Sequence, residues 1–256
     1  MAELLQVNNA SMIFGGLRAV SNLTMRIDEG KLIGLIGPNG AGKTTAFNML
    51  TGVYEPTEGT IVFDGQKING KKPYQVTNMG IARTFQNIRL FSELTVLDNV
   101  KIAFNSHIRY GLLEAIGRFG RYFKEEKVVE EKALELLKIF HLEQFQREMA
   151  KNLPYGEQRR LEIARALATG PRLLLLDEPA AGMNPQETKE LMELIRWIKQ
   201  EFKLSILLIE HDMNLVMNVC QRIYVLEYGI CIASGTPEEI KRNKRVIKAY
   251  LGEEVS

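Results

Sequence analysis

The sequence predicts an α/β fold with a parallel central sheet, and three stretches carry this prediction. A glycine-rich loop at residues 37–44 follows an apolar run at 32–36 and leads into a segment, 43–50, that reads as a helix. Four leucines at 173–176 show no alternation with polar residues, which is typical of a parallel strand covered on both faces. Another apolar run, 205–209, also ends in polar residues. In open α/β sheets such strand ends carry the ligand-handling residues.

Composition limits the possible classes of protein. The chain has 256 residues, 45% hydrophobic and 25% charged, so we expect one large domain with room for an inserted subdomain. A net charge of +2 is too small to indicate nucleic acid as a partner. Cys220 and Cys231 form no ligand cluster, and we expect them to be structural. With no secretory signal and no apolar run of about 18 residues, we expect a cytoplasmic protein that reaches a membrane only through partners.

The first third of the chain predicts a small antiparallel β-layer beside the main sheet. Residues 4–14 and 23–27 read as strands, with a turn at Gly15-Gly16 between them. A short strand at 60–63 and a short helix at 74–79 follow the helix at 43–50.

The glycine-rich loop fits the pattern G-x-x-x-x-G-K-[ST], the phosphate-binding P-loop. Glycines let the backbone curl so that successive N–H groups point at phosphate oxygens, and the following helix adds the positive end of its dipole. Lys43 would reach the β- and γ-phosphates, and the Thr44 hydroxyl would ligate Mg²⁺. A turn that binds nothing is the alternative, but loop, lysine and hydroxyl occur together between the right elements. The loop consists of Gly37, Pro38, Asn39, Gly40, Ala41, Gly42, Lys43 and Thr44.

Residues 81–86 read as a strand that ends at Gln86. This glutamine either caps a loop or touches Mg²⁺ or the attacking water, and the short motif leaves both open. Residues 94–151 read as mostly helical, with Thr95 capping a helix towards residue 108 and a second helix from about residue 125. The segment 110–124 between them is rich in glycine, aromatic and basic residues, which suits the solvated tip of a helical hairpin slightly better than an edge facing lipid headgroups or a membrane partner.

Residues 153–158 open a helix that Gly170-Pro171 ends. Leu161, Ala164 and Ala168 line one face of this helix, and we expect Arg159, Arg160 and Arg165 on the other faces.

Polar residues end both later strands. Asp177 and Glu178 follow the four leucines, and they read as a magnesium-binding and a water-polarising carboxylate rather than as solvated loop residues. Neighbouring side chains on an extended segment point to opposite sides, so Asp177 would face the metal and Glu178 the water. His211, at the end of the 205–209 strand, would reach the γ-phosphate or the attacking water, with a structural histidine as the alternative.

Two further helix starts carry capping signals. Asn184-Pro185-Gln186-Glu187 has an N-cap residue, a proline at N1 and an acid at N3. Residues 222–226 and 230–233 read as paired strands, and Thr236 to Glu239 would cap a last helix.

The order of these motifs resembles that of the ATP-binding cassette (ABC) ATPases over nearly the whole chain. Phe14 matches the aromatic residue that stacks on adenine, and His211 matches the switch histidine. The other matches are Gly37–Thr44 with Walker A, Gln86 with the glutamine loop, Leu153–Gln158 with the signature, Leu173–Glu178 with Walker B and Ala181–Asn184 with the D-loop. Pro154 and Tyr155 depart from the usual L-S-G-G-Q signature, so the serine hydroxyl that would donate to a γ-phosphate is absent.

Within the family, three stretches look like the ATPase subunit of branched-chain amino acid importers: residues 83–91, 155–165 and 249–252. Importers of urea or short amides and a lipopolysaccharide-export ATPase are the alternatives inside the fold. A soluble cassette ATPase acting on DNA or ribosomes usually has two cassettes or a coiled-coil insertion, and this chain has neither. A P-loop kinase would need neither the signature helix nor His211.

The resemblance implies an α/β P-loop NTPase fold: a RecA-like parallel core, an antiparallel β subdomain and an inserted α-helical subdomain. Residues 1–93 and 171–256 would form the first two, and about 94–170 the helical subdomain, within one ABC ATPase domain spanning 1–256. It also implies ATP and Mg²⁺ as cofactors, with Glu178, His211 and Gln86 catalytic. ATP would be bound by Phe14, residues 37–44 and Thr45, and Mg²⁺ by Thr44, Gln86 and Asp177. Asn184 would act in the D-loop. The ATP of a second subunit would be contacted by Tyr155, Gly156, Glu157 and Gln158.

The implied partners follow from the same resemblance. They are two transmembrane permease subunits, a second ABC ATPase (a relative or a second copy) and, indirectly, a periplasmic or extracellular solute-binding protein, with no nucleic acid. The protein would lie on the inner face of the cell membrane, held there by the permease.

Overall fold

The computed structural model describes residues 2–104 and 121–251. Contacts within the chain divide it into two compact units. Unit 1 comprises Met1–Gln86 with Arg172–Ser256, and unit 2 comprises Asn87–Pro171.

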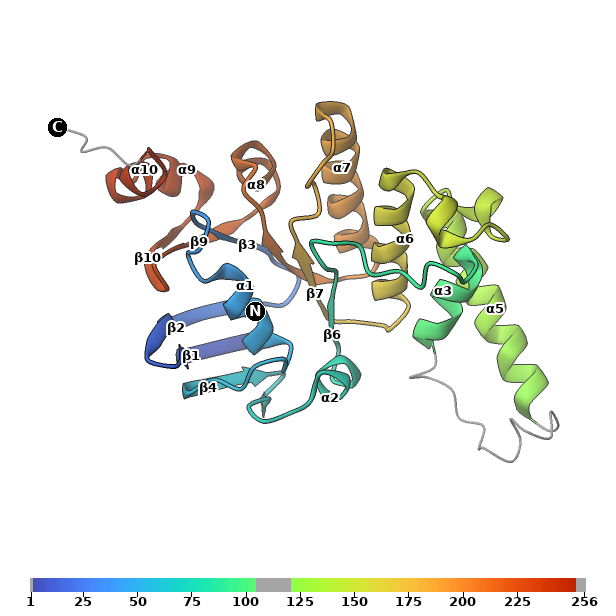
Figure 1. The fold of residues 1–256 in the computed structure, drawn as a ribbon, viewed down its shortest axis with the longest axis horizontal. Helices are drawn as coiled ribbons and strands as arrows, with labels where there is room; N and C mark the ends of the chain where they lie inside the picture. The colour runs from blue at the N-terminus through green and yellow to red at the C-terminus, as the bar shows by residue number, and fades with distance from the viewer. Residues whose placement is uncertain (1, 105–120, 252–256) are drawn as a thin grey trace. The chain divides into compact units, whose positions relative to one another are not determined.

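Unit 1 is built on one mixed sheet, whose strands in the described residues follow the order β5-β4-β1-β2-β10-β9-β3-β8-β7-β6 (Figure 1). The run β9-β3-β8-β7-β6 is parallel, while β5-β4-β1-β2 is antiparallel. The strands are β1 Glu3–Phe14, β2 Leu17–Asp28, β3 Leu32–Ile36, β4 Glu58–Phe63, β5 Gln66–Lys67, β6 Ile81–Arg83, β7 Leu173–Asp177, β8 Ser205–Ile209, β9 Arg222–Glu227 and β10 Ile230–Gly235. This arrangement confirms the predicted α/β class with a parallel core and an antiparallel layer.

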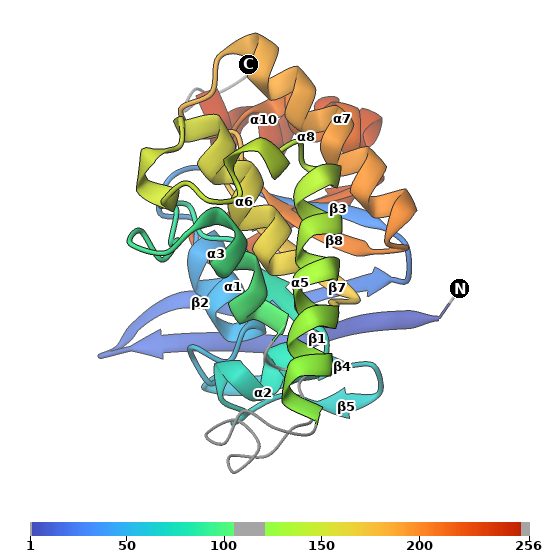
Figure 2. The same cartoon turned by 90° about the vertical axis from the view of Figure 1, so that its right-hand side faces the viewer.

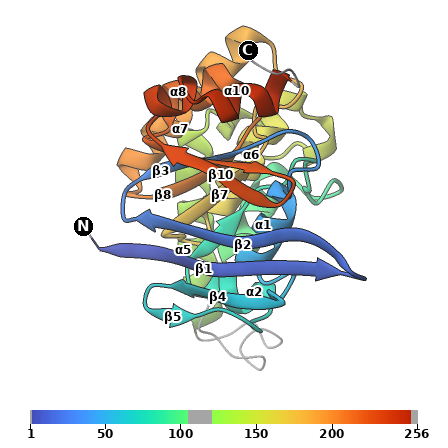
Figure 3. The same cartoon turned by 90° about the vertical axis from the view of Figure 1, so that its left-hand side faces the viewer.

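The helices of unit 1 cover both faces of the parallel strands. In Figure 1, α7 and α8 lie on one face and α1 on the other, and Figure 3 shows the antiparallel strands as a separate layer beyond α1. Phe47 of α1 is fully buried in a hydrophobic cluster with Phe63 of β4 and Leu175 of β7, so α1 joins the two layers. The helices are α1 Lys43–Leu50, α2 Pro73–Asn78, α7 Pro185–Glu201, α8 Met213–Val219, α9 Pro237–Lys241 and α10 Lys244–Leu251.

Unit 2 consists of helices, among which α3, α5 and α6 pack on one another (Figure 2). Thr95 caps α3 by accepting a hydrogen bond from the Asp98 backbone N–H at 3.0 Å, as its sequence position predicts. Buried Asn99 fixes the preceding loop by bonding both the N–H and the C=O of Phe91, at 2.9 and 3.0 Å. The elements are α3 Val96–Ala103, α5 Arg121–Ile139, the 3₁₀ turns η2 Glu143–Phe145 and η3 Ala150–Asn152, and α6 Tyr155–Leu167.

Several predicted elements differ from the observed ones. The strand predicted at 81–86 ends at Arg83, because Thr84 turns away after its N–H bonds the Leu175 carbonyl. Two helices follow Thr236 rather than one, since α9 stops at Lys241 and α10 begins at Lys244. Helix α8, at Met213–Val219, was not predicted from the sequence. Of the basic and aromatic segment 110–124, residues 110–120 lie outside the described residues, and residues 121–124 open α5.

Arg159 is the clearest error in the predicted burial pattern. We expected it on an outer face of its helix, yet it is fully buried. Its guanidinium donates to Glu162 at 2.8 Å, and Glu162 is buried too, so the two charges balance inside unit 2. No described helix is long and apolar enough to cross a membrane.

The central strands should dominate the stability of unit 1. Replacing fully buried Leu175 with alanine removes packing inside the sheet, and we expect a loss of about 2–5 kcal/mol. Leu17 is 71% exposed, so Leu17→Ala should change stability by less than about 0.5 kcal/mol. Urea unfolding of both variants measures the difference, and equal midpoints would contradict the assigned burial.

Candidate active site

One row of backbone pairing sets the layout of the site. β8 lies between β3 and β7, and its last residue, Ile209, pairs with Leu35 on one side and with Asp177 on the other. Because these strands are parallel, the residues that follow them emerge at the same edge of the sheet. The sheet therefore brings together the P-loop, Asp177 with Glu178, and Glu210 with His211, all within unit 1.

The P-loop has the backbone that its glycines predict. Gly40 and Gly42 have φ values of 78° and 98°, in the left-handed region that favours glycine. A Cβ atom on Gly42 would lie 2.6 Å from the Ala19 carbonyl oxygen, so a side chain does not fit there. Gly42 is also the N-cap of α1 and brings no side-chain acceptor, which leaves the first N–H groups of the helix to an anion.

Lys43 lies inside this loop. Only 6% of the residue is exposed, and its Nζ donates to the carbonyls of Gly37 at 2.7 Å and Pro38 at 3.0 Å. Burial lowers the pKa of Lys43, and the carboxylates of Glu178 and Asp177 oppose that shift. The charge of Lys43 is thus held where a phosphate group in the loop would meet it. Thr44 is exposed and Thr45 half-buried at the start of α1.

Asp177 is buried and already has a cationic partner. Its carboxylate accepts a 2.6 Å hydrogen bond from Arg83, whose side chain is also buried. Arg83 in addition donates to Asn48 at 2.7 Å, and its guanidinium lies 5.4 Å from the Phe47 ring centroid. Arg83 was not singled out from the sequence, although it stands three residues before Gln86; in the structure it is the last residue of β6 and pairs with Leu175 of β7.

Glu178 does not continue the strand. Its φ of +46° shows a left-handed backbone, so the predicted alternation along an extended segment is wrong as the reason for separating it from Asp177. The turn still directs the two carboxylates differently. Glu178 Oε2 accepts a 2.6 Å hydrogen bond from Gln86 and lies 3.6 Å from His211 Nδ1. The structure therefore brings together Gln86, Glu178 and His211, the three residues predicted to be catalytic.

His211 is open to solvent, with 60% of its side chain exposed. The residue before it, Glu210, is fully buried and accepts hydrogen bonds from the backbone N–H groups of Ala180 at 2.8 Å and His211 at 3.1 Å. Burial raises the pKa of Glu210, and these hydrogen bonds counteract the shift. From the sequence, Glu210 was predicted only to end a strand, because a single acid after an apolar run gives no sign of burial.

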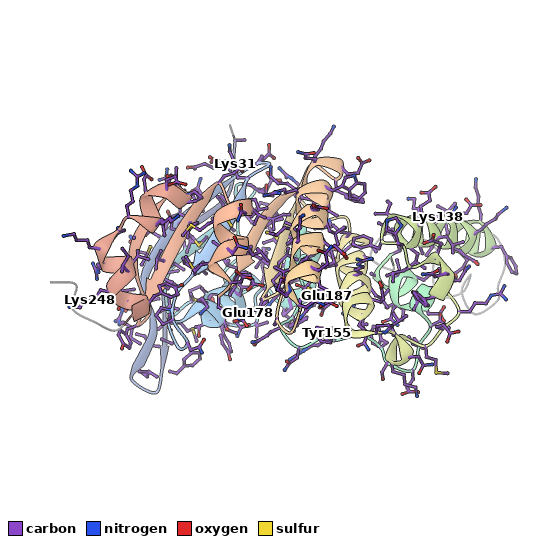
Figure 4. The ribbon with its side chains drawn as sticks, turned by 90° about the horizontal axis from the view of Figure 1, so that it is seen from above. Lys31, Lys138, Tyr155, Glu178, Glu187 and Lys248 are labelled. Carbon is purple, nitrogen blue, oxygen red and sulfur yellow. The ribbon has the colours of Figure 1, made fainter. Side chains whose placement is uncertain are left out.

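Asn184 and Phe14 are two further predicted site residues of unit 1. Asn184 caps α7, accepting from the N–H groups of Gln186 and Glu187 at 2.9 and 3.0 Å. Figure 4 labels Glu187 in the first turn of α7 and Glu178 on the loop after β7. Phe14, at the end of β1, is 39% exposed and meets Tyr54 edge-to-face, with 5.2 Å between ring centroids.

The predicted signature residues form the first turn of α6 in unit 2. Tyr155, labelled in Figure 4, is 46% exposed. The guanidinium of Arg159 lies 5.9 Å from its ring centroid, and Arg159 Nη2 donates to the Tyr155 hydroxyl at 3.3 Å. Gln158 donates to the Leu153 carbonyl at 2.8 Å. Pro154 is the N-cap and has no hydrogen-bonding side chain to offer the helix. Gly156, Glu157 and Gln158 are all half-buried.

These residues fit a nucleoside triphosphate with magnesium. The loop supplies N–H donors and a buried lysine, and Asp177 supplies one carboxylate. No group of three or more His, Cys, Asp or Glu residues in the described part of the chain could hold a metal ion by itself. Magnesium suits such a site, because it is usually held by one or two carboxylates with substrate phosphates and water. Thr44, Gln86 and Asp177, the residues predicted for magnesium, would serve it, and Mg²⁺ would neutralise the charge of the phosphates.

The comparisons with known proteins agree with this geometry. A family model described as "ABC transporter" matches residues 20–181, and a model described as "Branched-chain amino acid ATP-binding cassette transporter" matches residues 231–256. The chain is 48% identical to the high-affinity branched-chain amino acid transport ATP-binding protein LivG of Escherichia coli K12, over 98% of each chain. It is 46% identical to BraF of Pseudomonas aeruginosa, again over 98% of each chain, and that protein's name describes the same kind of transport.

More distant matches share the fold. The lipopolysaccharide export system ATP-binding protein LptB of E. coli is 34% identical over 98% of each chain. Among solved structures, the ADP conformation of MJ1267, an ATP-binding cassette of an ABC transporter, matches with a TM-score of 0.85 and 30% identity, covering 99% of this chain and all of the other. A dimeric cassette, MJ0796 bound to ADP and phosphate, matches with a TM-score of 0.77 and 27% identity over 91% and 99% of the two chains. The chain belongs to the ABC transporter family and is an ATP-binding cassette ATPase of that family.

Proposed function

We propose that this protein hydrolyses ATP to drive the import of branched-chain amino acids through a membrane permease. The observation that carries the catalytic part is the meeting of a buried P-loop lysine, a buried aspartate and the Gln86–Glu178–His211 cluster at one edge of the sheet. The choice of solute rests on the relatives, which are named for branched-chain amino acid transport, and on the family model at residues 231–256.

The nucleotide would be held mainly by charge. Lys43 donates to neutral loop carbonyls, and bonds from the same ammonium to negatively charged phosphate oxygens would be stronger than these. Thr44 and Asp177 would bind the magnesium ion, Asp177 through water. The exposed Phe14 ring would stack on adenine, an interaction that does not read the edges of the base.

Glu178 would polarise the attacking water. Gln86 and His211 both approach its Oε2 atom, so Gln86 can orient the water and the metal ligands while His211 stabilises charge on the γ-phosphate. Most of the work is therefore positioning and electrostatic stabilisation, as expected for phosphoryl transfer.

The signature turn of α6 would serve the ATP bound by a second cassette. Pro154 offers no hydroxyl, so the backbone N–H of Gly156 and the helix N-terminus would be the main donors. The second cassette is a relative or another copy of this chain, and a dimeric cassette among the structural matches supports this arrangement. Two permease subunits would bind the helical subdomain at about 94–170 and hold the protein on the inner face of the membrane, with a solute-binding protein acting outside.

Lys43→Ala should weaken ATP binding strongly. The variant loses charge-assisted contacts worth ~2–3 kcal/mol, or roughly 30- to 150-fold in affinity. Equilibrium binding of a fluorescent ATP analogue measures this, and exposed Lys241 provides the control, since Lys241→Ala should bind as the wild type does. Unchanged affinity in Lys43→Ala would exclude Lys43 from the site.

Glu178→Gln should bind ATP normally and hardly hydrolyse it. Glutamine keeps the shape of the side chain but loses its basicity, and general-base assistance is typically worth ~10²- to 10⁴-fold in rate. With hydrolysis blocked, MgATP should hold two cassettes together, which size-exclusion chromatography detects. Turnover at the wild-type rate would mean that Glu178 is not the base and would make His211 the leading candidate.

The solute can be tested with the assembled transporter. The protein purified from its native membranes should bring two permease subunits with it. ATP hydrolysis by this complex in lipid vesicles should rise when a binding protein loaded with leucine, isoleucine or valine is added. Stimulation by urea or short amides instead, or co-purification of lipopolysaccharide-export proteins, would favour the alternative systems and reject branched-chain amino acid import.

A further inference from the structure

Glu210 is a buried acid that the proposed chemistry does not use. It is fully buried, and the structure gives its carboxylate three backbone donors: the N–H groups of Ala180 at 2.8 Å, His211 at 3.1 Å and Asp212 at 3.4 Å. Burying a carboxylate is unfavourable unless such hydrogen bonds compensate for the lost water. An apolar residue would fill the same space without this penalty, so packing alone does not account for a glutamate here.

The donors come from two different loops. Ala180 lies in the loop after β7, two residues beyond Glu178. Its backbone N–H donates to one oxygen of the Glu210 carboxylate, Oε1. His211 and Asp212 lie in the loop after β8 and bond the other oxygen, Oε2. A second backbone bond connects the same loops, from the Glu178 N–H to the Ile209 carbonyl at 2.9 Å. Glu210 thus bridges the loop that carries Glu178 and the loop that carries His211.

We propose that Glu210 is a positioning residue that holds Glu178 and His211 in register for attack on the γ-phosphate. The proposal rests on the hydrolytic function assigned to these two side chains, whose polar atoms are 3.6 Å apart. Ala180 also leads directly into residues 181–184, the D-loop, so movement of that loop against a second cassette would reach His211 through the same carboxylate.

Glu210→Gln isolates this bridge. Glutamine has nearly the same shape but a single acceptor oxygen, so one of the two loops would face an NH₂ group instead of an acceptor. Small misplacements of catalytic groups are costly, and we expect kcat to fall roughly 10- to 100-fold while the KM for ATP stays within about twofold. Glu193, an exposed residue of α7, provides the matched control, because Glu193→Gln should leave both constants unchanged.

A double-mutant cycle separates positioning from general stabilisation. If Glu210 acts partly through His211, Glu210→Gln should cost less in a His211→Ala background than in the wild type. Equal losses in the two backgrounds, or a wild-type kcat in Glu210→Gln, would overturn the proposal. A wild-type protein that binds ATP without hydrolysing it would instead reject the proposed function itself.

A measurement on the unmodified protein covers the case in which Glu210→Gln does not fold. In hydrogen exchange followed by NMR, the amides of Ala180 and His211 should be protected although both lie outside helices and strands. Exchange at the rate of an open loop would show that the bridge does not exist in solution and would overturn the proposal.

Discussion

The register of β8 is the constraint on which the site depends. Ile209, the last residue of β8, pairs with Leu35 of β3 and with Asp177 of β7. The residues that follow these strands, including the P-loop, Glu178 and His211, therefore begin at the same level of the sheet. A slip of one residue in a strand turns every side chain to the opposite face of the sheet. β7 and β8 are buried on both faces, and apart from Asp177 and Ser205 they consist of leucine and isoleucine, which would tolerate a slip. The two polar residues are what a slip would misplace: Ser205 accepts a hydrogen bond from the Gly30 N–H at 2.9 Å, and Asp177 accepts one from Arg83 at 2.6 Å. These polar contacts at the strand ends therefore fix the register of the catalytic edge.

The buried charges of Asp177 and Lys43 both have hydrogen-bond partners within the protein. Asp177 lies against Arg83, and Lys43 lies against carbonyl oxygens of its own loop. A buried charge without a partner would be strongly destabilising, and these contacts prevent that. These contacts differ in how easily another partner can replace them. Lys43 contacts neutral groups, which a phosphate can replace, whereas Asp177 and Arg83 are two buried ions, and separating them would leave both charges without a partner. The lysine is thus the more adaptable group and the aspartate the more rigid one.

Local patterns predicted the elements best. The bounds of β3, α1 and β8 agree with those expected from sequence, because each is a short apolar or amphipathic run with clear ends. Contacts between residues far apart in the sequence were the features that the sequence patterns failed to predict. Arg83 and Asp177 are 94 positions apart, and neither position signals the pairing. Arg159 and Glu210 were missed for a related reason: charged residues are expected at the surface, and their burial becomes visible only when their partners are in place.

The predicted catalytic trio came together although part of its reasoning was wrong. The different roles of Asp177 and Glu178 were predicted by assuming an extended backbone, but Glu178 has a left-handed backbone. This conformation costs roughly 1–2 kcal/mol for a residue with a side chain. Such strain persists only when surrounding contacts determine the conformation. Those contacts are visible: the Glu178 N–H bonds the Ile209 carbonyl, the Glu178 carbonyl accepts from Ala181 at 3.2 Å, and Ala180 is tied to Glu210. The turn that places Glu178 within reach of Gln86 and His211 is therefore held by the end of β8 and by Glu210, the buried residue that follows this strand.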